Sequence, residues 1–347
     1  MDRRPDARGE RRAAFLAAAG VTPESAAPLA GDASNRRYFR AGGHILMDAP
    51  PELGEDVRPF IAVTHWLRAL GLSAPEVLAA DDQHGFLLLE DLGEGLFSAM
   101  LRDGAADEEA LYCAAVDLLA DAAGVSAPDE IGPPGCRVEL APYGAAVLTR
   151  EARLMTEWWV PAATDEDASG AMSDELDVLV IAATAEAEAA RDVVVLRDYH
   201  ADNLIWLPER DGTARVGLLD YQDALAGHPA YDLMSLLEDA RRDTSDALRE
   251  AMIERYLARR PELEPGAFRA AYAALGAQRN MKIVGIFARL ALRDGKPRYL
   301  SMIPRVWRHL QRDLAHPALG ELAAWVSRRV PIPSEDVLAR FAGRVGT

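Results

Sequence analysis

Apolar and polar positions over the first 92 residues alternate in a way that predicts a small sheet with helices. A short helix is expected around residues 12–19. The segments RRYFRA and HILM predict the two strands of a hairpin, because Gly42 and Gly43 between them favour a tight turn. Residues 57–70 carry apolar side chains at helical spacing, and FLLLEDLG is typical of a buried strand. These elements predict a compact first lobe over residues 1–92.

From Gly95 onward the pattern turns helical, which predicts a larger, mostly α-helical second lobe over residues 93–347. LYCAAVDLLADAAG is the clearest amphipathic run, and a long helix is expected over residues 268–292. One β-rich stretch interrupts the helices, with runs at residues 193–196, 204–207 and 215–219. The expected fold class is therefore α+β, with two lobes.

Composition and charge narrow the range of partners. The 347-residue chain is half apolar and 27% charged, which is typical of a globular protein. A net charge of -17 argues against a nucleic acid or an anionic membrane as the partner, because both would be repelled. Cys113 and Cys136 provide no disulfide framework, and no segment resembles a signal peptide or a membrane span. A cytoplasmic protein is expected.

Polar residues that could carry chemistry concentrate in the β-rich stretch. In LRDYHADN a short apolar strand leads into a loop where Asp198 and Asn203 lie five residues apart, and Asp220 ends another apolar strand. This order resembles the catalytic loop and metal-binding Asp of protein kinases, with Leu196 where a His is usual. Asn203 and Asp220 offer oxygen ligands suited to Mg²⁺, and Asp198 could accept a hydrogen bond from an attacking hydroxyl. The alternative is that all three are ordinary turn or cap residues.

Two segments of the first lobe predict a nucleotide site. FLLLEDLG resembles the hinge of protein-kinase-like enzymes, in which backbone groups around Glu90 and Leu92 would pair with the adenine edge. GDASNRRYFR is expected to cover the phosphates of the nucleotide. The candidate contacts in that segment are Gly31, Ser34, Asn35 and Arg36. A buried strand followed by a loop, and a polar hairpin tip, are the respective alternatives.

The usual ion pair of kinases of this fold is missing. Most of them pair a strand lysine with a helix glutamate, but the strand HILM places Met47 at the lysine position. Phe60 then falls near the position of the glutamate. The joint loss of both charges is physically reasonable, because either charge left buried without its partner would destabilise the fold. Arg36, Arg37 and magnesium ions are the candidates for meeting the phosphate charge, and plain surface arginines are the alternative.

The chain as a whole resembles the bacterial anomeric sugar kinases, a branch of the aminoglycoside phosphotransferase superfamily that acts on N-acetylmuramate and N-acetylglucosamine. The resemblance covers about residues 12–330. The segments that carry it are GDASNRRYFR, ILMDAPP, FLLLEDLG, LRDYHADNLIWL, LLDYQDALAGHPAYDLMSLLEDARRD and QRNMKIVGIFARL. It implies a protein-kinase-like two-lobed fold and ATP- and Mg²⁺-dependent phosphorylation of the C1 hydroxyl to an α-1-phosphate, in peptidoglycan recycling. The implied partner is a small amino sugar.

The acceptor site is the part that the sequence defines least. Trp158 and Trp159 could offer a flat apolar face to a pyranose ring, although paired tryptophans are more often packing residues. His200 could reach the acceptor or hydrogen-bond its own loop. Asp232, in HPAYDL, is expected to brace the catalytic loop through backbone amides, as the corresponding residue does in related kinases. Further acceptor candidates on the late helix are Arg279, Asn280 and Lys282, with a solvated helix face as the alternative.

Two other functions stay open on the sequence. A related kinase could act on a different hydroxyl, such as that of an aminoglycoside, choline or homoserine. A pseudokinase that binds nucleotide without turnover is suggested by Met47 in place of lysine. The presence of Asp198, Asn203 and Asp220 argues against this second alternative.

Overall fold

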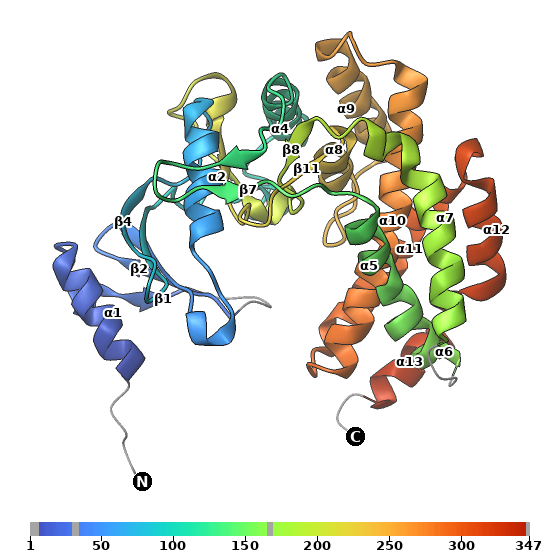
Figure 1. Ribbon diagram of the computed structural model, residues 1–347, viewed down its shortest axis with the longest axis horizontal. Coiled ribbons are helices and arrows are strands. Elements are labelled where there is room, and N and C mark those ends of the chain that lie inside the picture. Colours follow the sequence, from blue (N-terminus) through green and yellow to red (C-terminus); the bar gives the residue numbers. More distant parts are fainter. Residues whose placement is uncertain (1–6, 30–34, 165–168, 345–347) are drawn as a thin grey trace. The chain divides into compact units, whose positions relative to one another are not determined.

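Figure 1 shows the computed structural model, in which residues 7–29, 35–164 and 169–344 are described. Contacts group the chain into two compact units that interleave along the sequence. The first unit comprises Met1–Leu118, Pro128–Leu140 and Asp202–Ala224, and the second comprises Leu119–Ala127, Ala141–Ala201 and Leu225–Thr347. These units are defined by contacts and combine separate chain segments, so they do not test the lobe boundary expected after residue 92, which stays a prediction.

The first unit is built around a five-stranded antiparallel sheet. Its spatial order is β1 (Ala27–Pro28), β2 (Arg37–Ala41), β3 (His44–Asp48), β5 (Phe86–Glu90) and β4 (Val77–Asp81). β2 and β3 form the predicted hairpin. At its turn Gly42 and Gly43 adopt φ values of 59° and 81°, which are unfavourable for residues with a side chain. The α+β class expected from the sequence is confirmed, although the pattern did not predict β1 and β4.

The remaining elements of the first unit are helices and two small hairpins. They are α1 (Ala7–Ala18), α2 (Arg58–Ala69), α3 (Phe97–Arg102), most of α4 (Glu108–Ala122), β6 (Glu130–Ile131), β7 (Val138–Glu139), β9 (Leu204–Trp206) and β10 (Val216–Leu218). The β9–β10 hairpin belongs to this unit because Ile205 and Leu207 pack against Leu92, the residue that follows β5 by two positions. This apolar cluster attaches the segment that carries Asn203 and Asp220 to the sheet region.

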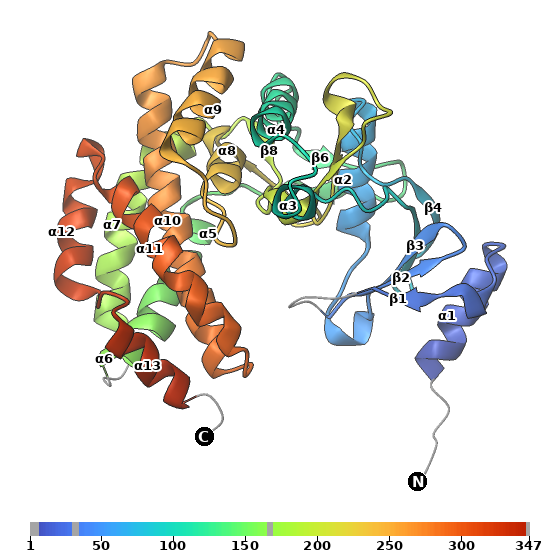
Figure 2. The same cartoon turned by 180° about the vertical axis from the view of Figure 1, so that it is seen from behind.

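The second unit is a set of helices with one short pair of strands. Its elements are α5 (Ala145–Leu154), a π-helical turn η3 (Met155–Trp159), α6 (Val160–Thr164), α7 (Gly170–Ala189), β8 (Val193–Val195), β11 (Leu225–Gly227), α8 (Ala230–Leu237), α9 (Asp246–Arg259), α10 (Pro265–Leu292), α11 (Ile303–Leu314), α12 (Gly320–Arg329) and α13 (Glu335–Arg344). α10, the long helix predicted from the sequence, contacts α5, α7, α8 and α11, and Figures 1 and 2 show it beside α11.

α10 approaches α5 very closely at one point. A Cβ added at Gly285 would lie 2.3 Å from the backbone carbon of Leu154, so only glycine fits there without a shift. This close approach brings the facing side chains of the two helices within hydrogen-bonding distance, including Glu151 on α5 and Lys282 on α10. The packing of α10 on α5 therefore assembles polar groups as well as apolar ones.

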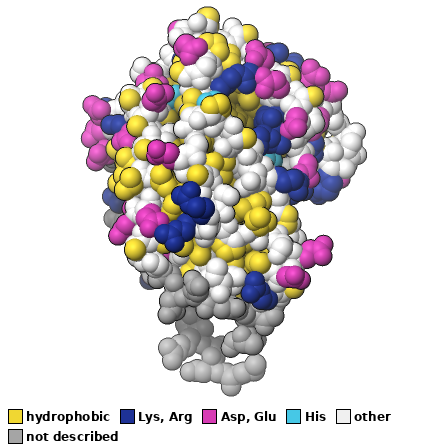
Figure 3. All heavy atoms as spheres, turned by 90° about the vertical axis from the view of Figure 1, so that its right-hand side faces the viewer, with side chains coloured by type: hydrophobic (Ala, Val, Ile, Leu, Met, Phe, Trp, Pro, Cys, Tyr) yellow, Lys and Arg dark blue, Asp and Glu magenta, His cyan; other side chains and the backbone are white. Residues whose placement is uncertain are grey.

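Some apolar side chains of the second unit face outward. Val178 and Ile181 on α7 are 67% and 45% exposed. Figure 3 shows hydrophobic side chains, interspersed with Lys and Arg, on the side of this unit that carries α12. No helix within the described residues is both long and apolar enough to span a membrane.

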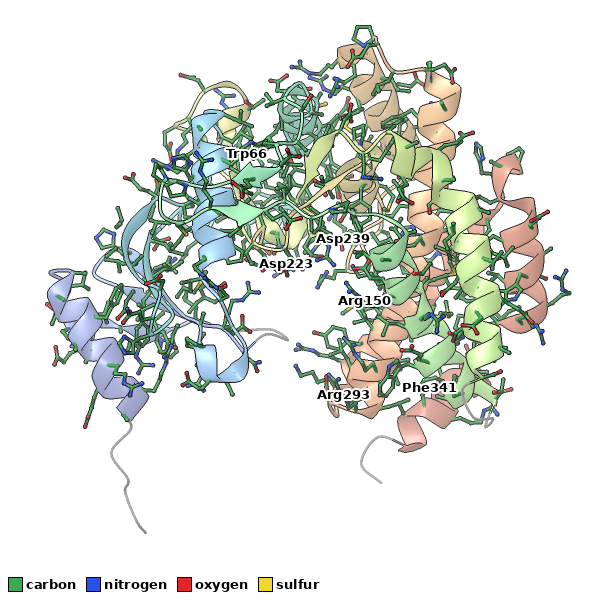
Figure 4. All side chains as sticks on the ribbon, viewed as in Figure 1. Trp66, Arg150, Asp223, Asp239, Arg293 and Phe341 are labelled. Atoms are coloured by element: carbon green, nitrogen blue, oxygen red, sulfur yellow. The ribbon has the colours of Figure 1, made fainter. Side chains whose placement is uncertain are left out.

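The paired tryptophans of η3 differ in their surroundings. Trp159 is 0% exposed, and its indole N–H donates to the carbonyl oxygen of Pro331 at 2.9 Å. Its ring stacks on Phe341, with ring centroids 4.9 Å apart, and Figure 4 labels Phe341 on α13. Trp159 is therefore a packing residue and has no face to offer a sugar. Trp158 is half-buried, and its contact with an acceptor stays a prediction.

This difference predicts unequal costs for two adjacent truncations. Trp159→Ala should lower the free energy of unfolding by about 3–5 kcal/mol, because it removes a fully buried ring and leaves a cavity. Trp158→Ala, the matched control, should cost clearly less because part of that ring is already in water. Urea denaturation followed by circular dichroism measures both, and equal losses for the two variants would contradict the packing described here.

Candidate active site

The catalytic loop predicted from the sequence begins with a strained turn. β8 pairs antiparallel with β11, with Val195 opposite Leu225. Immediately after the strand, Arg197 adopts a φ of 71°, and the amide of Asp198 donates to the carbonyl oxygen of Leu196 at 2.9 Å. A hydrogen bond that spans three residues around a positive φ is a tight and energetically costly turn. The surroundings must therefore hold it in place.

Asp232, near the start of α8, stabilises the turn at Arg197 through hydrogen bonds to its backbone. Its Oδ2 accepts the amide of Leu196 at 2.7 Å, and its Oδ1 accepts the amide of Arg197 at 2.9 Å. Burial raises the pKa of Asp232 to about 7, while the two amide hydrogen bonds act in the opposite direction. The expected bracing role of Asp232 is confirmed by these two hydrogen bonds.

Asp198 projects from the turn into a strongly positive environment. Its side chain is 46% exposed, and Nη2 of Arg279 lies 4.0 Å from its Oδ1. Partial burial of this half-exposed carboxylate raises the pKa of Asp198, but the charges of Lys282 and Arg279 outweigh this effect, so the pKa lies below its ordinary value. Asp198 is therefore ionised near neutral pH, as a hydrogen-bond acceptor for an attacking hydroxyl should be.

A buried glutamate that the sequence did not reveal organises these cations. Oε1 of Glu151 lies 2.5 Å from Nη2 of Arg197 and 3.0 Å from Nζ of Lys282. The hydroxyl of Tyr143 donates to Oε2 of Glu151 at 2.6 Å. Burial raises the pKa of Glu151, yet Lys282 and Arg197 more than compensate, and the pKa lies below its usual range. Glu151 lies on α5, more than forty residues before Asp198, and no motif in the sequence marks it.

Two other predicted acceptor residues lie inside the protein. His200 is 5% exposed, its Nε2 lies 3.4 Å from Nη1 of Arg241, and burial lowers its pKa, so the imidazole is neutral near pH 7. Arg241 lies outside the loop of His200, so this contact does not decide between the two expected roles, and contact of His200 with the acceptor stays a prediction. Asn280 is 0% exposed, and its Nδ2 donates to Glu238 at 2.7 Å and to Asp313 at 2.9 Å. Asn280 thus joins α8, α10 and α11, and its expected contact with the sugar is not supported.

Asn203 and Asp220 emerge at the same end of the β9–β10 hairpin. Leu204 pairs with Leu218, and the amide of Leu219 donates to the carbonyl oxygen of Asn203 at 3.0 Å. Asp220 adopts a φ of 56°, and its Oδ1 accepts a hydrogen bond from the side-chain Nε2 of Gln222 at 2.8 Å. The predicted pair of oxygen ligands is therefore assembled by one hairpin.

Asn203 and Asp220 suit Mg²⁺ better than a metal ion that takes all of its ligands from protein side chains. Within the described residues, no three His, Cys, Asp or Glu side chains form a metal-binding cluster. One carboxylate and one carboxamide leave most coordination positions to water and phosphate oxygens, as Mg²⁺ prefers. Asn203 and Asp220 are thus suited to hold a metal ion that is shared with a phosphorylated ligand.

The predicted nucleotide-binding residues are only partly described. Gly31 and Ser34 lie outside the described residues. The side-chain Nδ2 of Asn35 donates to the carbonyl oxygen of Leu53 at 3.3 Å. Arg36 lies beside Asp220, with its Nη1 3.5 Å from Oδ1 of Asp220. Arg36 also donates to Glu55 at 2.8 Å.

The predicted hinge follows β5. The carboxylate of Glu90 lies 2.5 Å from Arg210, and Leu92 is buried against the β9–β10 hairpin. These are side-chain contacts, so the expected pairing of the backbone near Glu90 and Leu92 with adenine stays a prediction.

The candidate residues are divided between the two units. Asp198 and Asp232 lie in the second unit, whereas Asn203, Asp220 and Arg36 lie in the first. Each group is preorganised within its own unit by the contacts described above. The chain connects them directly, because only four residues separate Asp198 from Asn203.

Comparison with known proteins identifies the family. The model of the phosphotransferase enzyme family (APH) matches residues 25–269. This chain belongs to that family. The match includes the catalytic loop, its bracing residue Asp232 and the β9–β10 hairpin, so the three features that define the site lie within the family region.

The chain is similar to curated members of this family over most of its length. It is 43% identical to the N-acetylmuramate/N-acetylglucosamine kinase of Caulobacter vibrioides, over 92% of this chain and 96% of that protein. It is 37% identical to the protein of the same name from Pseudomonas aeruginosa, over 87% of this chain and 88% of that protein.

Solved structures share the fold at low sequence identity. A choline/ethanolamine kinase family protein from Mesorhizobium loti aligns with a TM-score of 0.59 at 14% identity, covering 97% of this chain and 99% of that one. An ADP-bound aminoglycoside phosphotransferase aligns with a TM-score of 0.57 at 14% identity, covering 88% and 97% of the two chains. These alignments confirm the expected protein-kinase-like fold class.

The positive environment of Asp198 predicts a pH effect. Lys282 is one of only two lysines in the chain, and Lys282→Met removes the charge that most lowers the pKa of Asp198. That pKa should rise, so the acid limb of kcat/KM for phosphotransfer should move to higher pH, with a larger loss at pH 5 than at pH 8. The measurement is a pH–rate profile from pH 4.5 to 8.5.

Lys296→Met, which removes the other lysine, is the matched control and should leave the acid limb in place. Glu151 keeps its contact with Arg197 in the Lys282 variant, so the local structure retains one of its two cations. A profile for Lys282→Met that keeps the shape of the wild-type profile would show that Lys282 does not act on the catalytic carboxylate.

Proposed function

We propose that this chain is an ATP-dependent kinase that phosphorylates the anomeric C1 hydroxyl of N-acetylmuramate and N-acetylglucosamine. The observation that carries the proposal is the 43% identity to the Caulobacter vibrioides kinase of that name, over nearly the full length of both chains. The α-1-phosphate product would serve peptidoglycan recycling. The proposed partner is a small amino sugar, and a cytoplasmic location stays a prediction.

Asp198 is the proposed catalytic residue. Its carboxylate, kept ionised by Lys282 and Arg279, would accept the proton of the C1 hydroxyl and orient the oxygen toward the γ-phosphorus. The new P–O bond would form as the bond between the γ-phosphorus and the leaving ADP oxygen breaks. The C1 hydroxyl of a reducing sugar is more acidic than an ordinary alcohol, because the ring oxygen withdraws electron density, so it needs less help in losing its proton.

Asn203 and Asp220 are the proposed ligands of Mg²⁺. They are supported by their common position at the end of the β9–β10 hairpin. Bound Mg²⁺ supplies neutralisation of the triphosphate charge. The proposed nucleotide contacts are Gly31, Ser34, Asn35 and Arg36 over the phosphates, and the backbone near Glu90 and Leu92 at the adenine.

For the acceptor, Trp158 remains the proposed apolar contact. Arg279 and Lys282 flank Asp198, so they are suited to an anionic or strongly hydrogen-bonding group close to the reacting hydroxyl. The lactyl carboxylate of N-acetylmuramate is such a group.

The proposal predicts a strict requirement for a free anomeric hydroxyl. N-Acetylmuramate and N-acetylglucosamine should both be phosphorylated, whereas their 1-O-methyl glycosides should give no phosphorylated product, because the methyl group replaces the proton that Asp198 accepts. Phosphorus NMR of the product should show a phosphate coupled to the anomeric proton.

Kanamycin and choline are tested in the same assay, because they represent the acceptors of the alternative kinase functions left open by the sequence. Phosphorylation of a methyl glycoside, or a product phosphate on C6, would contradict the anomeric assignment while leaving a kinase in place. Turnover with kanamycin or choline alone would overturn the amino-sugar assignment.

A further inference from the structure

The position that usually carries a phosphate-binding lysine holds an apolar side chain in this chain. Met47, on β3, is 1% exposed and pairs across the sheet with Tyr38 on β2 and Leu87 on β5. Phe60, on α2, stacks on Tyr221 with ring centroids 5.0 Å apart. Neither the strand position nor the helix position carries a charge, so the phosphate charge has to be met by another residue.

A cation from a different part of the first unit lies beside the predicted metal ligand. Arg36 directly precedes β2, and its Nη1 is 3.5 Å from Oδ1 of Asp220. On its other side, Nε of Arg36 donates to Oε2 of Glu55 at 2.8 Å. The side chains of Arg36 and Glu55 are 16% and 15% exposed, whereas that of Asp220 is 49% exposed. The guanidinium is thus held by a largely buried carboxylate and faces an open one.

This geometry gives the two carboxylates different roles. A pair as buried as Arg36 and Glu55 is screened less by salt than a surface pair, and its fixed hydrogen bond limits the motion of the guanidinium. Asp220 is exposed and lies at the end of the β9–β10 hairpin. Arg36 would therefore supply a guanidinium donor for phosphate beside the carboxylate that would hold the metal ion.

Tyr221 links the same residues by packing. Its ring stacks on Phe60, and its hydroxyl lies 2.6 Å from the hydroxyl of Thr64, also on α2. Asp220, the residue before it, is therefore fixed relative to α2 without an ion pair between strand and helix. Glu55 lies just ahead of α2, so the segment that positions Arg36 is continuous with the helix that positions Asp220.

We propose that Arg36 binds the triphosphate of the nucleotide in this chain and that Glu55 is its positioning residue, replacing the usual lysine–glutamate pair. The proposal rests on the proposed function in taking Asp220 as the ligand of the nucleotide-bound metal. It moves the phosphate-binding ion pair from β3 and α2 to the residue that directly precedes β2 and to Glu55, three residues before the start of α2.

The test separates phosphate contacts from general damage by using a ligand without phosphates. Titration calorimetry measures MgATP and adenosine binding to the wild type, Arg36→Met and Arg11→Met. Arg11→Met is the control, because it removes one positive charge at an exposed position on α1 that has no proposed role in the site. MgGTP and guanosine are titrated in parallel, so that the result does not depend on the base preferred.

Arg36→Met should weaken binding of the nucleoside triphosphate by about 10- to 100-fold, the range for losing one charge-assisted hydrogen bond, and should leave nucleoside binding unchanged. Arg11→Met should change neither affinity by more than about twofold. An equal loss in both variants, an equal loss for triphosphate and nucleoside, or no loss in Arg36→Met would each overturn the proposal. A wild type that binds the triphosphate but phosphorylates no amino sugar would instead count against the proposed function alone.

Glu55→Gln tests the positioning role. It should weaken triphosphate binding about tenfold in the wild-type background and have almost no further effect in Arg36→Met, because it acts through Arg36. Arg36→Lys, which keeps the charge but not the fork of donors, should recover part of the affinity. Additive losses for Glu55→Gln and Arg36→Met would show that Glu55 does not act through Arg36.

Discussion

The site depends on one buried carboxylate that holds a strained turn. Asp232 accepts the amides of Leu196 and Arg197, and the positive φ of Arg197 is maintained by these two hydrogen bonds. Without them the turn would relax, since a non-glycine residue at such a φ carries a conformational cost. Asp198 is the next residue, so its direction is set by this turn. The start of α8 therefore determines where the proposed base points.

A second constraint is the balance of charge around Asp198. Three cations, Arg197, Arg279 and Lys282, lie near one another in a largely buried region, which would be costly without compensation. Glu151 pairs with two of them and is itself held by Tyr143. The remaining net positive charge near Asp198 keeps its carboxylate ionised, although partial burial favours the protonated form. The close packing of α10 on α5 at Gly285 makes the arrangement possible.

The sequence predicted the turns and strands that depend on residues close together in the chain. The β2–β3 hairpin followed from Gly42 and Gly43. The predicted β-rich runs at residues 204–207 and 215–219 contain β9 and β10, whose pairing brings Asn203 and Asp220 to one hairpin end. The bracing role of Asp232 came from resemblance to related kinases, and the two amide hydrogen bonds confirm it.

Features that depend on distant partners could not be predicted in the same way. Glu151 and Glu55 carry no motif, and their importance appears only when α5 faces α10 and when Glu55 meets Arg36. Asn280 looked like a polar helix residue open to a ligand, but α8 and α11 cover it and supply Glu238 and Asp313 as partners. Trp159 was ambiguous for the same reason, since Phe341 and Pro331 lie far along the chain. Helical periodicity marks a buried face without naming what covers it.

The most direct test of the account is the rate of phosphoryl transfer by Asp198→Asn in a single turnover with bound MgATP and N-acetylglucosamine. The rate should fall by about 10²- to 10⁴-fold while nucleotide affinity stays within about twofold of wild type, because the amide keeps the shape of the side chain but removes the anionic acceptor. Asp192→Asn, which neutralises an exposed carboxylate just before β8, should transfer at the wild-type rate. Transfer by Asp198→Asn at a rate close to that of wild type would contradict the assignment of Asp198 as the base.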